Sequence, residues 1–183
     1  PHSRRLIASV RPLVASRSRT AASIASSPSH TRDRCSTDSG GNQASGQSHY
    51  AGISDDGRFI SFFSSAADLV SDDANEADDV FRKDLQTGET LRCSTDSSGG
   101  EGYRWMDNQW QSMSSDGRYV AFTSHAPNLD PPMVYNGLEV FRKDLDSGET
   151  IRCCTSDRGI YGEKDSYGPA ITADGKYVAF LSE

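Results

Sequence analysis

The chain has 183 residues, a formal net charge of −7 and a hydrophobic fraction of 34%, which is low for a globular domain. All 26 acidic residues follow residue 30, and so acidic a surface excludes nucleic acid as a natural partner because the phosphates would be repelled. No apolar run approaches the roughly 20 residues that span a bilayer, so we expect no membrane span. Abundant Gly and Ser favour short strands joined by many turns.

Residues 1–30 differ from everything that follows. They are rich in Ser, Ala and Arg and contain no acid, no aromatic residue and no glycine. We expect this tract to be disordered, or to be a degenerate stretch read out of frame. An organelle transit peptide, which has a similar composition, is the alternative.

Residues 31–183 contain an internal repeat. Three sequence blocks return in one order at steps of about 60 residues, which is the signature of a repeat architecture. The first block is 54–62, repeated at 114–122 and 172–180; the second is 79–90, repeated at 139–150; the third is 34–38, repeated at 92–96 and, less closely, from 152.

Each block predicts a strand or a turn. Asp56-Gly57 predicts a tight turn that leads into a strand, because Gly adopts positive φ freely and Asp bonds to the local backbone. A second strand begins at Val80 and ends at a turn over 86–89, and a third covers 91–95. With a short segment at 109–113, each unit has four strands, joined alternately by short turns and long loops.

These motifs resemble those of a known family. Ser-x-Asp-Gly-Arg-Tyr-Val-Ala-Phe, followed by Val-Phe-x-x-Asp-Leu-x-x-Gly, is similar to the bacterial TolB-type, WD-repeat-like β-propeller repeat. The resemblance implies an all-β fold of about three four-stranded antiparallel propeller blades of about 60 residues each, in an incomplete ring. It further implies a scaffold for protein contacts, located in the periplasm or outside the cell.

The blades divide the acidic part of the chain. We predict a partial unit over 31–48, two units over 49–96 and 97–156, and a second partial unit over 157–183. Because a propeller ring needs typically 4–8 blades, we expect the chain to be a fragment of a larger ring. Further blades would come from missing sequence or from an oligomer.

The connections point to one functional surface. The short turns share one face of the blades, and the long loops, roughly 64–77 and 96–108, share the other, which we name the long-loop face. Loops on a rigid scaffold are where binding is concentrated. No catalytic motif such as Gly-x-Ser-x-Gly is present, so we predict a non-catalytic scaffold that binds a protein or peptide there. The alternatives are the propeller of a carbohydrate- or peptide-acting hydrolase or lyase, and a calcium-stabilised extracellular adhesive module.

The second long loop supplies the candidate binding residues Tyr103, Trp105, Asp107 and Trp110. Aromatic rings beside carboxylates could stack on a sugar or anchor a peptide. Trp110 aligns with Tyr50 in the repeat, so we expect it to pack between blades instead. For Trp105, core packing and partner contact both stay open.

The first long loop is acidic and contains a candidate calcium site at Asp73, Asn75 and Asp78. Alternate oxygen ligands of this kind wrap a hard cation in calcium loops. The alternative is a solvated acidic loop without a metal. No other cofactor is expected.

The four cysteines show neither a CxxC pair nor zinc-site spacing. Cys35, Cys93 and Cys153 occupy one repeat position, and equivalent positions in neighbouring units lie too far apart for a disulfide. We therefore expect Cys153, its neighbour Cys154 and the other two to be free thiols that act as small buried hydrophobic residues.

Overall fold

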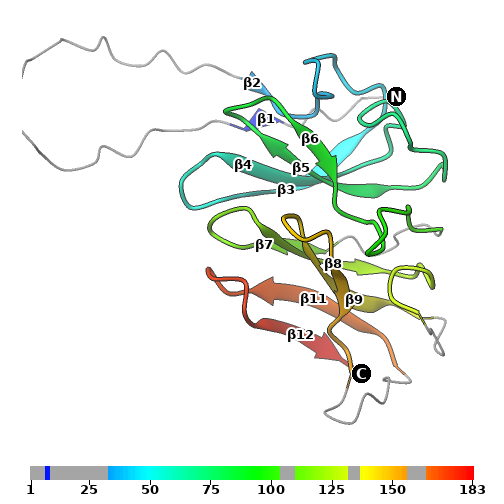
Figure 1. The fold of residues 1–183 in the computed structure, drawn as a ribbon. Coiled ribbons are helices and arrows are strands. Elements are labelled where there is room, and N and C mark those ends of the chain that lie inside the picture. Colours follow the sequence, from blue (N-terminus) through cyan, green and yellow to red (C-terminus); the bar gives the residue numbers. More distant parts are fainter. Residues whose placement is uncertain (1–6, 9–32, 104–109, 132–136, 156–163) are drawn as a thin grey trace, which may run out of the picture.

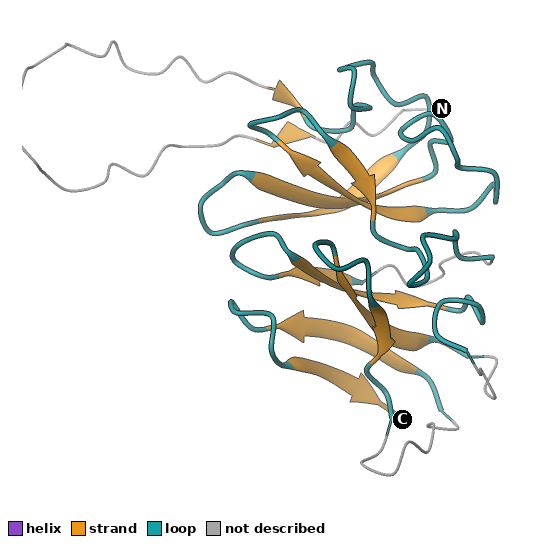
Figure 2. Ribbon diagram, in the orientation of Figure 1, coloured by secondary structure: helices purple, strands orange, loops and turns teal. Residues whose placement is uncertain are grey.

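The computed structural model describes residues 7–8, 33–103, 110–131, 137–155 and 164–183 (Figure 1). These residues form strands and loops only, so this part of the chain is all-β (Figure 2). Consequently no helix in these ranges is long and apolar enough to cross a membrane. The tract over 1–30, apart from Ile7 and Ala8, lies outside the described residues, as do Trp105 and Asp107.

Two four-stranded antiparallel sheets follow one another, each with its strands in chain order. Figure 1 shows these sheets stacked between a short strand pair at one end and a hairpin at the other. This arrangement confirms the predicted propeller blades in an incomplete ring. The first sheet contains β3 (Ser48–Ile53), β4 (Phe59–Ser64), β5 (Asp79–Asp84) and β6 (Thr90–Arg92); the second contains β7 (Gln111–Met113), β8 (Tyr119–Ser124), β9 (Glu139–Asp144) and β10 (Thr150–Arg152); the short pair is β1 (Ile7–Ala8) with β2 (Asp33–Arg34), and the hairpin is β11 (Ser166–Ile171) with β12 (Val178–Ser182).

The register repeats with the sequence. Phe62 lies opposite Phe81 in the first sheet, and Phe122 lies opposite Phe141 in the second. In the short pair, β1 pairs with β2, whose Arg34 begins the first copy of the third repeated block. In the same way, β5 pairs with β6, whose Arg92 begins the second copy. The pair β1–β2 therefore corresponds to the two outer strands of a blade, and β11–β12 to the two inner strands.

The hydrophobic core lies between the sheets. Phe63 and Val80 of the first sheet pack with Val120 and Phe122 of the second. Because β4 and β5 are buried on both faces, their side chains hold the blades together on either side. The cysteines are free, and three of the four are buried, as predicted; Cys153 is only partly buried.

The Asp-Gly turns join one blade to the next. Gly117 has a φ of +70°, and a β-carbon there would lie 2.3 Å from the ring of Phe59 in the preceding blade. The guanidinium groups of Arg58 and Arg82 each lie 4.6 Å from the centre of that ring, and Arg82 donates a hydrogen bond to the Gly117 carbonyl. Glycine is thus required both for the backbone conformation and for the close approach of the ring.

Buried lysines tie each blade to the loop before it. The Lys83 ammonium donates hydrogen bonds to the carbonyls of Thr37, Asp38 and Gly88 at 3.3, 2.8 and 2.6 Å. Lys143 repeats this arrangement in the second blade. Burial lowers the pKa of both ammonium groups, and nearby acidic groups oppose that shift. These contacts fix the connection between blades at its outer side.

Candidate functional site

We name the face of the blades that bears the short turns the turn face. The carboxylates of its Asp-Gly turns are hydrogen-bonded within the turns. The Asp56 carboxylate accepts hydrogen bonds from the Ser54 hydroxyl at 2.6 Å and from the Arg58 amide at 2.9 Å. These bonds, the Ser54 bond foremost, lower the pKa of Asp56. Asp116 makes the same two bonds in the next blade. The carboxylates of the Asp-Gly turns therefore stabilise the turns themselves.

The long loops are braced by a buried arginine on β6. The side chain of Arg92 is only 4% exposed, and its guanidinium lies 3.1 Å from the Asp72 carboxylate and 3.0 Å from that of Glu101. A third carboxylate, that of Asp73, lies 3.5 Å away. Asp72 and Asp73 belong to the first long loop and Glu101 to the second, so one cation joins the two loops.

The residues predicted to bind calcium face different partners. Asp73 faces Arg92, and the Asn75 amide donates to the Asp79 carboxylate at 3.0 Å and to the Gly102 carbonyl at 2.8 Å. Asp78 lies 3.7 Å from the imidazole of His49. Over the described ranges, no three His, Cys, Asp or Glu side chains are grouped so as to hold a metal ion. Calcium binding at this loop stays a prediction.

Asp79 is the most strongly perturbed carboxylate beneath the first long loop. Burial raises its pKa from 3.8 to about 6, although hydrogen bonds from Ser94 and Asn75 act in the opposite direction. In the second blade, Glu139 and Cys154 occupy the positions of Asp79 and Ser94. Burial raises the pKa of Glu139 as well, and the nearby cation of the β10 arginine opposes that rise.

We expect Asp79→Asn to remove a pH dependence of stability. The folded-state pKa of Asp79 lies above its ordinary value, so its contribution to stability is present below about pH 4 and is lost as the pH rises towards about 6. Relative to the variant, the native chain should lose about 2–3 kcal/mol of unfolding free energy across that window. Urea denaturation between pH 4 and 7 measures this difference, with the exposed carboxylate variant Asp146→Asn as the control. A difference that stays constant with pH would contradict the expectation.

The predicted aromatic residues are exposed where the structure describes them. Tyr103 is 71% exposed, and its amide donates to the Asn128 side chain at 3.1 Å. Trp110 is 52% exposed, so the expectation that it packs between blades is wrong. It precedes β7, an inner strand whose side chains are only partly buried, and its repeat equivalent Tyr50 is exposed as well. Trp105 and Asp107 lie outside the described residues.

A groove of about 560 Å³ lies beside the first long loop. The Asp68 carboxylate, in one wall, accepts hydrogen bonds from the Ser45 amide at 3.0 and 3.1 Å. Asp38, in the other wall, accepts two bonds from Asn42, which lower its pKa and keep it ionised. The groove is lined by Asp38, Ser39, Gly40, Ala67, Asp68, Leu69, Val70, Ser71 and Thr90.

The sequence interpretation missed this groove. Its walls come from a turn at 38–40, which starts at the last residue of a repeated block, and from a loop segment at 67–71 that lies about 30 residues further along the chain and outside the blocks. One signal was available, because Asp38 and Asn42 flank two glycines in the pattern of a local turn.

The outer edges of the blades are capped. The amide of Thr90 in β6 donates to the Ser39 hydroxyl at 2.9 Å, and that of Thr150 in β10 donates to the Ser97 hydroxyl at 2.9 Å. The amide of Arg152 donates to the Asp130 carboxylate at 2.9 Å. Side-chain oxygens thus accept hydrogen bonds from edge-strand amides that an added strand would otherwise pair with.

Comparisons with known proteins gave similarity of fold only. No protein-family model matches the chain, and neither does any curated protein. Among solved structures, the tricorn protease is similar over 74% of this chain and 11% of its own, at 16% identity and a TM-score of 0.48. A putative TolB from Agrobacterium tumefaciens matches 74% of this chain and 38% of its own (19% identity, TM-score 0.46). TolB from Acinetobacter baumannii matches 76% and 27% (20% identity, TM-score 0.44).

The chain therefore spans far less than two thirds of the length of each of these proteins. Their likeness concerns the fold alone. The assignment of propeller blades rests on the strand order, the pairing and the repeated register of the chain itself.

Proposed function

We propose that the chain is a non-catalytic β-propeller scaffold that binds a protein or peptide partner through its long-loop face. The observation that carries this proposal is the groove beside the first long loop, whose volume of about 560 Å³ suits a short peptide segment. Its lining, as far as the structure describes it, contains serines but no histidine or lysine that could activate them. We place this function in the periplasm or outside the cell, on the resemblance of the repeat.

The loop that forms the groove is held in place before any partner binds. Arg92 joins the first long loop to the second, and Asn75 bonds to the Gly102 carbonyl across the same boundary. A loop fixed in this way loses little conformational entropy on binding. Preorganisation therefore supports a binding role for this face.

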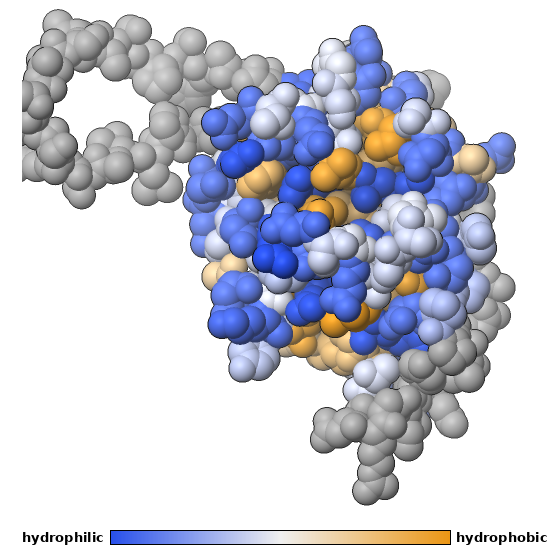
Figure 3. Space-filling model, in the orientation of Figure 1, coloured by the Kyte–Doolittle hydropathy of each residue, from blue (hydrophilic) through white to orange (hydrophobic). Residues whose placement is uncertain are grey.

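The groove favours a partner with a basic side chain. Its lining includes the acidic residues Asp38 and Asp68 and the apolar residues Leu69 and Val70. Lys and Arg combine an aliphatic stem with a cationic head, which matches a lining that is both apolar and acidic. In the view of Figure 3 the surface is mostly hydrophilic, with apolar residues in small separate groups, so charge is the main basis for recognition on it.

We expect Asp68→Asn to weaken peptide binding without disturbing the fold. Asn128 occupies the equivalent position in the second blade and accepts the Tyr103 amide at 3.1 Å, so an amide fits this backbone. Peptides selected from a random library on the native chain should be rich in Lys and Arg. Their Kd should rise about tenfold in the variant, as expected when one charge pair worth about 1.4 kcal/mol is lost.

Isothermal titration calorimetry with the selected peptides measures this change. Asp146→Asn, which removes a carboxylate from the turn face, is the matched control and should leave the Kd unchanged. Equal affinity for the native chain and Asp68→Asn, or a loss confined to Asp146→Asn, would refute the proposal.

A further inference from the structure

The acidic residues of the groove already use the edge of the carboxylate that an arginine would need. An ionised carboxylate binds a guanidinium side by side when both oxygens on one edge are open to two parallel N–H groups. The Ser45 amide lies 3.0 Å from one Asp68 oxygen and 3.1 Å from the other. Because these two distances are nearly equal, the amide lies between the oxygens and occupies that edge.

The Asp38 carboxylate is occupied in a similar way by a single residue. The backbone amide of Asn42 donates to Asp38 Oδ1 at 2.7 Å, and the side-chain amide of Asn42 donates to Oδ2 at 2.8 Å. Two donors of Asn42 therefore span both oxygens, as the two arms of a guanidinium would. The capacity that remains on Asp38 and Asp68 is for single hydrogen bonds.

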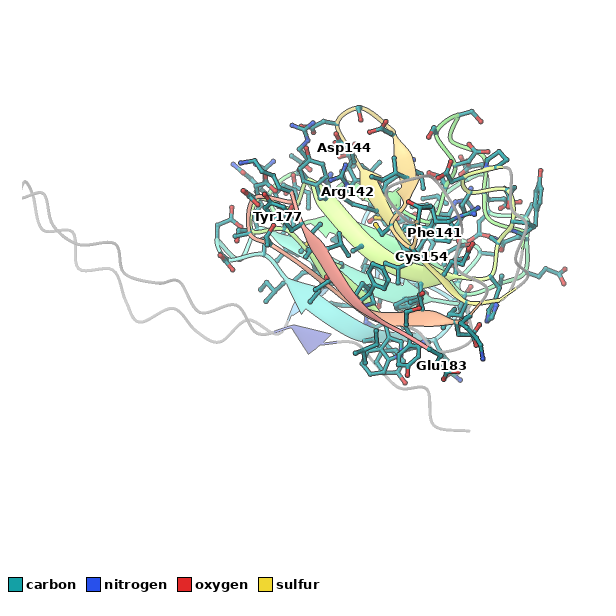
Figure 4. The ribbon with its side chains drawn as sticks, turned by 90° about the horizontal axis from the view of Figure 1, so that it is seen from below. Phe141, Arg142, Asp144, Cys154, Tyr177 and Glu183 are labelled. Carbon is teal, nitrogen blue, oxygen red and sulfur yellow. The ribbon has the colours of Figure 1, made fainter. Side chains whose placement is uncertain are left out.

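Elsewhere the chain shows how it binds an arginine. Asp144, at the end of β9 (Figure 4), accepts Arg118 Nε on Oδ1 at 2.8 Å and Arg118 Nη2 on Oδ2 at 2.7 Å. In the first blade, Asp84 accepts Arg58 on both oxygens as well. These two carboxylates offer both oxygens to one guanidinium, whereas both oxygens of Asp68 are shared with an amide of the chain.

The chain also binds an ammonium, at the turn that lines the groove. The Lys83 ammonium is held by single bonds to separate oxygens, among them the Asp38 carbonyl at 2.8 Å and the Thr90 hydroxyl at 3.1 Å. An ammonium has three donors on a compact, rotatable head and does not require paired acceptors. Separate single acceptors therefore suit a lysine better than an arginine.

The lining offers a guanidinium no ring on which to stack. Arginine stacks on aromatic faces, which is part of what distinguishes it from lysine. In this chain, Arg58 and Arg82 each lie 4.6 Å from the centre of the Phe59 ring. Among the described residues that line the groove, none is aromatic. This second observation also favours an ammonium over a guanidinium.

We propose that the groove selects lysine over arginine in the peptide that it binds. The ammonium makes single hydrogen bonds to the open acceptor sites of Asp38 and Asp68, and its aliphatic stem contacts the apolar part of the lining. A guanidinium reaches each carboxylate with one N–H only, so its remaining donors lose water without gaining a partner. This inference rests on the proposed function and specifies the ligand of the same groove.

Three versions of each selected peptide test the proposal by isothermal titration calorimetry. Every basic position is Lys in the first, Arg in the second and trimethyl-lysine in the third. The Lys version should bind with a Kd about tenfold lower than that of the Arg version. The trimethyl-lysine version keeps the charge and the stem but has no N–H donor, so it should bind no more tightly than the Arg version.

Asn42→Ala tests the cause of the preference. Asn42 is exposed, and its equivalent in the second blade, Gly100, donates its amide to the Asp96 carboxylate at 2.8 Å without a side chain, so the turn does not require one. The variant releases Asp38 Oδ2, and the preference for Lys should fall to about threefold. Gln86→Ala removes an exposed side-chain amide from the turn face and is the matched control, which should keep the tenfold preference.

Equal or tighter binding of the Arg version to the native chain would overturn the proposal. So would a trimethyl-lysine version that binds as tightly as the Lys version, or an unchanged preference in Asn42→Ala. If Asp68→Asn weakens binding but the Lys and Arg versions bind alike, the proposed function stands and the selection of lysine fails. If no peptide binds the native chain, or if Asp68→Asn has no effect, both fail.

Discussion

Replacing Gly117 with alanine should lower the free energy of unfolding by about 3–5 kcal/mol. Part of this loss, about 1–2 kcal/mol, comes from placing a β-carbon on a residue whose φ is +70°. The remainder comes from a clash, because the new β-carbon would lie 2.3 Å from the ring of Phe59. Arg58 and Arg82 flank that ring and restrict its movement, so the strain has no easy relief.

Gly148→Ala separates the two causes. Gly148 also has a positive φ, +78°, but no atom lies within 4 Å of the position that a β-carbon would occupy. This variant should lose only the backbone contribution of about 1–2 kcal/mol. Urea denaturation of both variants measures the difference. Equal losses would show that the ring of Phe59 does not press against the Asp-Gly turn of the next blade.

The second large effect is expected for Arg92→Met, at about 3–5 kcal/mol. The substitution keeps much of the aliphatic bulk but leaves the buried Asp73 carboxylate and the partly buried Glu101 carboxylate without their cation. The first long loop should then separate from the second, because Arg92 also donates to the Asp72 carbonyl at 3.1 Å. Denaturation measures the loss of stability, and amide hydrogen exchange measures the loosening of residues 65–78.

Lys176→Met is the control for that substitution. Lys176 pairs with Asp174 at 3.1 Å, a distance like those around Arg92, but both side chains are exposed. An exposed pair contributes at most about 1 kcal/mol. If Arg92→Met costs no more than Lys176→Met, or if exchange in residues 65–78 is unchanged, Arg92 does not organise the long-loop face.

The fold could be predicted from the sequence because its determinants are local and repeated. The Asp-Gly pair specifies a turn at Gly57, Gly117 and Gly175, and all three glycines have positive φ. The aromatic residues that recur in the strands then pair in the same register in each blade, with Phe62 opposite Phe81 and Phe122 opposite Phe141. The blocks that predict turns and strands recur in the same order about every 60 residues, and this recurrence identified the four-stranded units.

The site could be predicted only in part, because it depends on contacts between loops. The acidic first loop suggested calcium, but a cation from the chain itself, Arg92, lies among its carboxylates. That arginine belongs to a repeated block, yet spacing along the chain does not show which loop folds over it. Trp110 was misassigned for a related reason. Alignment with Tyr50 gave its place before an inner strand but not whether anything covers it.

Backbone amide exchange, measured with and without a selected Lys- or Arg-rich peptide, tests the central claim most directly. If the long-loop face is the binding surface, the peptide should slow exchange at residues 65–71 and 38–45, around the groove. Exchange in the Asp-Gly turns at 54–58 and 114–118 should be unaffected. Protection confined to those turns, with none around the groove, would contradict the account.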